Sequence, residues 1–138
     1  MERLKITIET LVAAPAEKAW RAWTDPGLIV RWNHASDDWI CPRAEIDLRT
    51  GGKFVYRMEA RDGSFGFDFA GTCDSVEPGR GIVSTLGDGR RTEVVFREEG
   101  KCTRVIETFE AEDRNTVEKQ RAGWAAILEN YRKVVEES

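Results

Sequence analysis

Short segments in which polar and apolar residues alternate fill most of the chain, and they are followed by one long stretch with a helical period. The alternation predicts strands at 3–11, 41–48, 53–60, 65–75, 80–86, 91–98 and 102–110. Gly, Asp and Pro separate the six later strands, which is typical of antiparallel hairpins. The apolar stripe over 115–136 predicts a helix. Because a single sheet cannot bury its apolar face alone, we expect this helix to cover it.

Two short helices are expected between the first and second strands, at 15–23 and 26–32. Asp25 is a candidate N-cap for the second helix, with Pro26 at the first helical position. Residues 33–40 are polar with one aromatic residue and predict a loop. The element order therefore indicates one α+β domain over residues 1–138.

The composition excludes several classes of function. Acidic residues (25) outnumber basic ones (21), so the net charge of −4 does not suggest a nucleic-acid partner. Three scattered cysteines and a single histidine give no zinc-ligand spacing, and no cofactor is expected. No apolar run approaches the ~20 residues of a membrane span, so no membrane insertion is expected. Reduced thiols and the absence of a signal-like N-terminus predict a cytoplasmic protein.

Two titratable residues are the candidates for chemistry. His34 is the only conventional base, and without a G-x-S-x-G context it is expected to be a loop or polar lining residue rather than a catalytic one. Glu107 shares a strand face with Val105 and Phe109, so it points inward if they do. A buried carboxyl needs a partner or takes a raised pKa. Because Ile106 on the other face is also apolar, an edge position or a slipped register is the alternative.

The aromatic residues of two neighbouring strands alternate so that they gather on one side of the sheet. One strand contributes Phe54, Tyr56 and Met58, and the next contributes Phe65, Phe67 and Phe69. Trp124, Ile127 and Tyr131 of the final helix could meet them. Such a stripe is commonly solid core, but adaptable Met, Tyr and Trp side chains beside the polar Gln120 and Glu107 favour a pocket.

The segment DLRTGGKF, residues 47–54, resembles a phosphate-binding loop only superficially. A P-loop requires G-x-x-x-x-G-K-[ST] and a following helix, whereas Lys53 precedes Phe54 and a strand. We therefore expect Gly51 and Gly52 to supply the positive φ angles of a tight hairpin turn, with Asp47 and Arg49 able to pair beside it.

Four motifs carry a resemblance that extends over nearly the whole chain: PAEKAW at 15–20, TDP at 24–26, DLRTGGKF at 47–54 and QRAGW at 120–124. On these the chain resembles the helix-grip (START-like, SRPBCC, birch-pollen-allergen-like) superfamily. Within it, the chain is similar to homologues of the heat-shock-protein-90 ATPase activator, a branch that includes polyketide cyclase-like proteins. The resemblance implies a curved seven-stranded sheet around the C-terminal helix, with a cavity for hydrophobic small molecules. It does not fix an activity, because the fold carries several.

Three functional hypotheses follow. The first is binding of a hydrophobic or aromatic small molecule, with contacts from Trp32, Trp39, Tyr56, Met58, Phe67, Phe69 and Trp124 and a polar end set by His34, Glu107 and Gln120. The second is a cyclase- or hydrolase-type enzyme with Glu107 or His34 as general base. The third is a protein-interaction or stress-related regulatory module. An exposed sheet edge could also support a homodimer.

Overall fold

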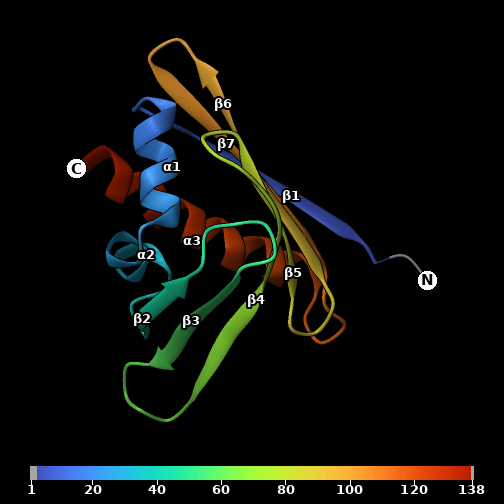
Figure 1. The fold of residues 1–138 in the computed structure, drawn as a ribbon. Coiled ribbons are helices and arrows are strands. Elements are labelled where there is room, and N and C mark those ends of the chain that lie inside the picture. Colours follow the sequence, from blue (N-terminus) through green and yellow to red (C-terminus); the bar gives the residue numbers. More distant parts are fainter. Residues whose placement is uncertain (1–2, 138) are drawn as a thin grey trace.

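A computed structural model describes residues 3–137 and has the predicted α+β architecture, a curved antiparallel sheet around a long C-terminal helix (Figure 1). The seven strands lie in the order β1-β7-β6-β5-β4-β3-β2. The elements are β1 (Lys5–Val12), α1 (Ala16–Thr24), α2 (Pro26–Trp32), β2 (Trp39–Ile46), β3 (Lys53–Ala60), β4 (Gly66–Glu77), β5 (Gly81–Leu86), β6 (Arg91–Glu99), β7 (Cys102–Glu110) and α3 (Val117–Glu137).

Two of the three helices start at capping residues in the sequence, whereas α1 follows Pro15 without a side-chain cap. Asp25 caps α2, because its Oδ1 accepts a hydrogen bond from the Gly27 amide at 2.9 Å. Helix α3 begins at Val117, slightly later than expected, since Thr116 caps it: the Lys119 amide donates to the Thr116 Oγ1 at 3.1 Å. The starts of α2 and α3 are thus set by local chemistry that the sequence displays.

Part of the core lies where α1 and α2 meet the C-terminal half of α3 (Figure 1), and the same buried cluster continues over the sheet to Phe54, Cys73 and Leu86. Tyr131 of α3 is fully buried there, and its hydroxyl donates to the Ala19 carbonyl oxygen of α1. Its ring also packs against Trp23 and Trp32, with ring centroids 4.9 and 5.3 Å apart. The N-terminal half of α3 contributes few fully buried residues and covers a different region, described below.

The second strand starts two residues earlier than expected, within the segment predicted as a loop. Trp39 pairs with Ala60, and a register shift between Ile40 and Arg43 allows the ladder to continue. At its other end the strand stops at Ile46, and residues 47–52 form the loop to β3, whose end hydrogen-bonds to the backbone of β4. The amide of Gly51 donates to the Cys73 carbonyl, and the Cys73 amide donates to the Gly52 carbonyl, both at 2.7 Å.

The expectation for the two glycines is half wrong. Only Gly51 has a positive φ, +87°. Gly52 is required for another reason: a Cβ there would lie 2.0 Å from the Asp47 carbonyl oxygen. The predicted pairing of Asp47 with Arg49 is present, with 2.8 Å between Nε and Oδ2.

Gly52→Ala is expected to destabilise the fold by about 2–4 kcal/mol, because relieving a backbone clash must displace the loop from β4. Gly51→Ala, which meets no atom within 4 Å, is expected to cost only about 1–2 kcal/mol for its left-handed backbone. Urea unfolding of the two variants measures the difference. Equal destabilisation would show that close approach at Gly52 is unimportant.

Candidate functional site

A pocket of about 500 Å³ lies between the N-terminal half of α3 and the curved sheet. A smaller chamber of about 70 Å³ adjoins it, since the two share several wall residues. The pocket is lined by Trp23, Trp32, Asn33, Tyr56, Met58, Phe67, Phe69, Arg90, Glu107, Glu112, Asn115, Lys119, Gln120, Gly123, Trp124 and Ile127. Five of these also line the small chamber: Trp23, Tyr56, Phe69, Glu107 and Trp124.

Aromatic side chains hold one another in place along the apolar wall. Trp124 of α3 stacks on Phe109 of β7 with ring centroids 3.9 Å apart, and its edge meets Phe69 of β4 at 6.1 Å. Phe69 is in turn parallel to Tyr56 of β3, 6.4 Å away. Because each ring packs on another, the protein's own side chains hold this wall in place.

Gly123 of α3 preserves open space beside this wall. A Cβ at this position would meet no atom within 4 Å. Glycine inside a helix costs up to about 1 kcal/mol relative to alanine. The helix is therefore locally less stable at Gly123, a position where any larger side chain would extend into the pocket.

Glu107 is the charged group deepest in the site. Val105 and Phe109 on the same strand face are buried, and the carboxyl lies in both chambers. No hydrogen bond or ion pair to it exists among residues 3–137. Desolvation by burial raises the pKa of Glu107 to about 8. The part of its surface that water can touch faces the cavity, so the group is half-buried by area and nonetheless strongly desolvated.

Tyr56 lies beside Glu107 at the junction of the two chambers. Burial raises the pKa of Tyr56, and the nearby acidic groups Cys73, Cys41 and Glu107 raise it further. Its hydroxyl therefore stays protonated. Within the described part of the chain no residue forms a hydrogen bond with it.

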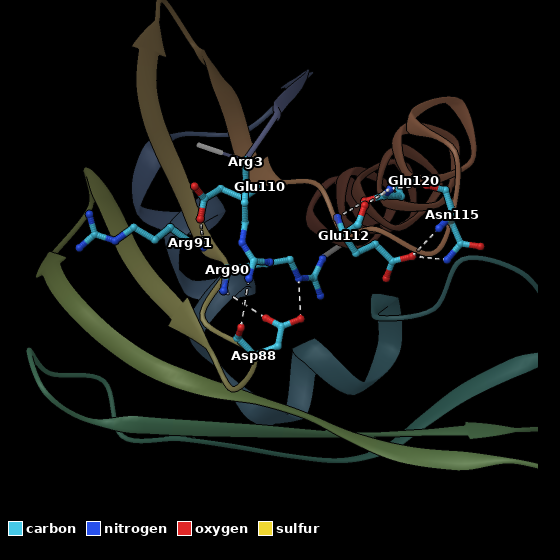
Figure 2. Close-up of polar contacts among 8 residues, drawn as sticks. All are labelled: Arg3, Asp88, Arg90, Arg91, Glu110, Glu112, Asn115 and Gln120. Atoms are coloured by element: carbon cyan, nitrogen blue, oxygen red, sulfur yellow. Dashed lines mark hydrogen bonds and ion pairs between the residues drawn. The ribbon is translucent and has the colours of Figure 1, made fainter. Parts of the chain in front are cut away.

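Gln120 lines the pocket, but its side-chain amide already forms hydrogen bonds within the protein (Figure 2). The Oε1 atom accepts from the Glu112 amide at 2.8 Å. The Nε2 atom donates to the Glu112 and Asn115 carbonyls at 3.2 and 2.8 Å. Gln120 therefore fixes the loop between β7 and α3, which the sequence pattern does not reveal.

Two predicted residues lie outside the pocket lining. The peptide carbonyl of His34 accepts from Asn130 at 2.7 Å, and its ring is not among the lining side chains. Trp39 instead contacts the rings of Phe65 and Phe67 edge-on at 6.1 and 6.0 Å. Of these two phenylalanines only Phe67 lines the pocket, and it is 41% exposed.

Several lining residues are absent from the predicted set, chiefly Asn33 and Arg90. Asn33 is buried next to Trp32, and its Nδ2 lies 3.5 Å from the Met58 sulfur. The side chain of Arg90 is only 12% exposed, and its Nε donates to Asp88 at 2.7 Å. Figure 2 shows its guanidinium pointing from the β5–β6 turn toward the loop that carries Glu112. A side chain in a turn is expected to be exposed to solvent, so the sequence does not indicate that Arg90 lines the pocket.

Comparison with known proteins agrees with this geometry. The family described as "Activator of Hsp90 ATPase homolog 1-like protein" matches residues 13–136. The chain belongs to this family. The resemblance predicted from the four motifs is thereby confirmed.

Solved structures support the placement of the chain in this family. The AHSA1-like protein from Aeromonas hydrophila is 44% identical with a TM-score of 0.91, covering 97% of this chain and 93% of that one. A protein from Cytophaga hutchinsonii is 42% identical with a TM-score of 0.84, covering 96% and 92%. A Nitrosomonas europaea protein, 17% identical over 97% and 95% of the chains with a TM-score of 0.83, shares the fold alone. No curated protein matches the sequence.

Two further observations bear on what this family member can do. Across residues 3–137 no three His, Cys, Asp or Glu side chains gather in a group that could hold a metal ion. None of the helices in that range is long and apolar enough to cross a membrane.

Proposed function

We propose that the protein binds a hydrophobic or aromatic small molecule in the pocket between α3 and the sheet. The observation that carries this proposal is an unpaired carboxyl, Glu107, inside a pocket walled by aromatic rings. The pocket's volume of about 500 Å³ falls within the range usual for small-ligand sites. A side chain kept only for stability would have been apolar at this position, because an unpaired buried carboxyl costs free energy.

Ligands that co-purify with the protein give a direct test. Native mass spectrometry of freshly purified protein is expected to show a bound species of small-molecule mass that denaturing conditions release. Its mass and extraction into organic solvent would identify the chemical class.

A pair of substitutions at Gly123 tests whether the ligand binds in this pocket. Gly123→Ala should retain binding of the apolar dye N-phenyl-1-naphthylamine and raise stability by up to about 1 kcal/mol, since the methyl meets no atom and favours the helix. Gly123→Phe should lower dye affinity at least about 10-fold because its ring takes the ligand's space. Fluorescence titration and thermal unfolding measure both effects. Unchanged dye binding by a folded Gly123→Phe variant would place the site elsewhere.

An enzyme is the second candidate, favoured by the Glu107 pKa of about 8. A catalytic acid or base works best when its pKa lies near the operating pH. Glu107 could exchange a proton with a substrate held against Trp124, whereas His34 is not in position to do so. Turnover of a co-purified compound, lost in Glu107→Gln but with binding retained, would support this role over binding alone.

A protein-interaction role has one observation in its favour, an exposed aromatic cluster formed by Trp39, Phe65 and Phe67. Phe65 is 61% exposed at the β3–β4 hairpin. Exposed aromatic patches often mark contact surfaces. Substituting Phe65 with Ser would leave dye binding intact if this cluster serves a partner rather than the pocket.

A further inference from the structure

A second hollow lies outside the pocket, where strand β5 is shorter than the strand beside it. Strand β5 begins at Gly81, opposite Val95 of β6, whereas β6 stays paired with β7 as far as Glu99. Residues 96–99 of β6 therefore extend beyond the end of β5. The groove beside them has a volume of about 890 Å³ and is bounded by β6, the β4–β5 turn and helix α1. No residue lines both this groove and the 500 Å³ pocket.

The peptide group of Glu98 has no partner on the open side of β6. The Phe96 amide donates to the Arg80 carbonyl oxygen at 2.8 Å, so Phe96 directs its backbone polar groups toward β5. Because this direction alternates along an antiparallel strand, the N–H and C=O of Glu98 point the same way. Within residues 3–137 no group forms a hydrogen bond with either of them. This short edge of the sheet is therefore open to an added strand.

The inner wall of the groove is apolar. Phe96 is buried and meets the half-buried Trp20 of α1 edge-on, with ring centroids 5.5 Å apart. Ile82 of β5 and Val94 of β6 also line the groove. An apolar wall beside an unpaired strand edge suits an extended peptide, because the peptide backbone bonds to the edge while a side chain packs on the wall.

The charged residues around the groove are mainly acidic. Four of the lining residues carry carboxylates and two carry guanidinium groups: Glu17, Glu77, Glu93, Glu98, Arg80 and Arg97. Arg97 is already paired with Glu99, with 3.2 Å between Nη2 and Oε2. None of the four carboxylates forms an ion pair in the part of the chain that the structure describes. The groove therefore favours a cationic partner.

The side chain of Glu98 is on the same face of β6 as Phe96. Glu98 lies opposite the fully buried Thr103 of β7, whose hydroxyl donates to the Ala14 carbonyl oxygen just before α1. The carboxylate of Glu98 is thus on the concave side of the sheet, the side that α1 covers. A peptide along β6 would meet this carboxylate and the Glu98 backbone together.

We propose that this groove binds an extended peptide segment of a partner protein, in which an apolar side chain lies between lysine or arginine residues. The segment would run antiparallel to β6 and exchange hydrogen bonds with the Glu98 peptide group. Its apolar side chain would pack against Phe96 and Trp20, and its basic side chains would meet Glu98 and Glu17. This site is separate from the small-molecule pocket, so the inference does not depend on the proposed function.

Two short peptides test the proposal by nuclear magnetic resonance with ¹⁵N-labelled protein. In one peptide lysine alternates with valine and leucine, and in the other glutamate replaces lysine. The lysine peptide is expected to shift the Glu98 amide and the Trp20 indole resonances, while the indole of Trp124 in the pocket stays unchanged. It should bind at least about 10-fold more tightly than the glutamate peptide, and about 0.5 M salt should reduce that difference.

Two variants at one position separate charge from backbone pairing. Glu98→Gln removes the carboxylate and should weaken binding of the lysine peptide about 3-fold. Glu98→Pro also removes the outward N–H but keeps the bonds to β7, which Arg97 and Glu99 form, and should weaken binding a further 3-fold or about that. Glu45→Gln on β2, an exposed carboxylate that does not line the groove, is the matched control and should bind as the parent chain does.

A lysine peptide with an N-methylated backbone tests the same pairing without changing the protein, and it should bind at least about 3-fold more weakly. Circular dichroism checks the folding of each variant. Equal affinities for the lysine and glutamate peptides, resonance shifts confined to the pocket, or full affinity of the N-methylated peptide would each overturn the proposal. So would the absence of binding at about 1 mM lysine peptide. The binding of N-phenyl-1-naphthylamine is measured at the pocket, so it distinguishes failure here from failure of the proposed function.

Discussion

At pH 8.5 the Glu107→Gln variant is expected to unfold on the order of 10 °C above the parent chain, whereas at pH 4.5 the two should unfold within about 2 °C of each other. The physical reason is proton linkage. Burial raises the pKa of Glu107 from 4.5 to about 8. Between these values the folded chain keeps a proton that the unfolded chain has released, so stability falls as pH rises across this window.

The shift in the pKa of Glu107 sets how much the free energy of unfolding falls, which is on the order of 4 kcal/mol once the pH exceeds 8. Glutamine does not titrate, so the variant does not suffer this loss. Carboxyls with lowered pKa values, such as Asp88 and Glu99, give the opposite trend. Because both proteins contain them, they cancel in the difference between the two stability curves.

Thermal unfolding at half-unit steps from pH 4.5 to 9 measures that difference. Glu98→Gln, an exposed carboxyl on β6, is the matched control and should give a nearly flat difference curve. A flat curve for Glu107→Gln as well would mean that Glu107 is well solvated, and the enzyme proposal would lose its basis.

Tyr131→Ala is expected to reduce the free energy of unfolding by about 3–5 kcal/mol, the usual cost of removing a large buried aromatic side chain. The ring is fully buried and connects α3 to α1 and α2 through Ala19, Trp23 and Trp32. Tyr131→Phe keeps the ring and should lose only about 1 kcal/mol, the net value of one hydrogen bond.

Urea unfolding at 25 °C distinguishes packing from hydrogen bonding at this position. Dye binding should also weaken in Tyr131→Ala, because Trp23 and Trp32 line the pocket and rest on this ring. Equal losses in the Ala and Phe variants would instead assign the stability to the hydroxyl. A loss below about 1 kcal/mol in Tyr131→Ala would show that the ring is not a support for the pocket wall.

The element order could be predicted because each signal is local. Alternation with a period of two, turn residues and the caps at Asp25 and Thr116 act within a few positions, and the structure follows them closely. The inward direction of Glu107 follows from the same alternation once its buried neighbours Val105 and Phe109 fix which face is inside. Position along a strand therefore determines which face a side chain takes.

Alternation does not determine how far the covering helix reaches. Phe65, Phe67 and Phe69 alternate identically, yet only Phe69 is covered, because the β3–β4 hairpin extends beyond α3. Gln120 shows a second limit, since its partners lie on a loop whose path the sequence does not specify. Arg90 shows a third: turn chemistry predicts an exposed side chain, whereas the side chain is only 12% exposed and lines the pocket.

The sheet joins sequence neighbours everywhere except at one edge, where β1 pairs with β7 and Lys5 lies opposite Glu110. Hairpins from β2 to β7 close short loops and can form quickly. The β1–β7 pairing closes a loop of about a hundred residues, so it costs more chain entropy. During synthesis the N-terminal strand must therefore wait for β7 to emerge. Helix α3, which covers the pocket, comes later still in the chain, so the aromatic face of β3 and β4 is synthesised well before the helix that covers it.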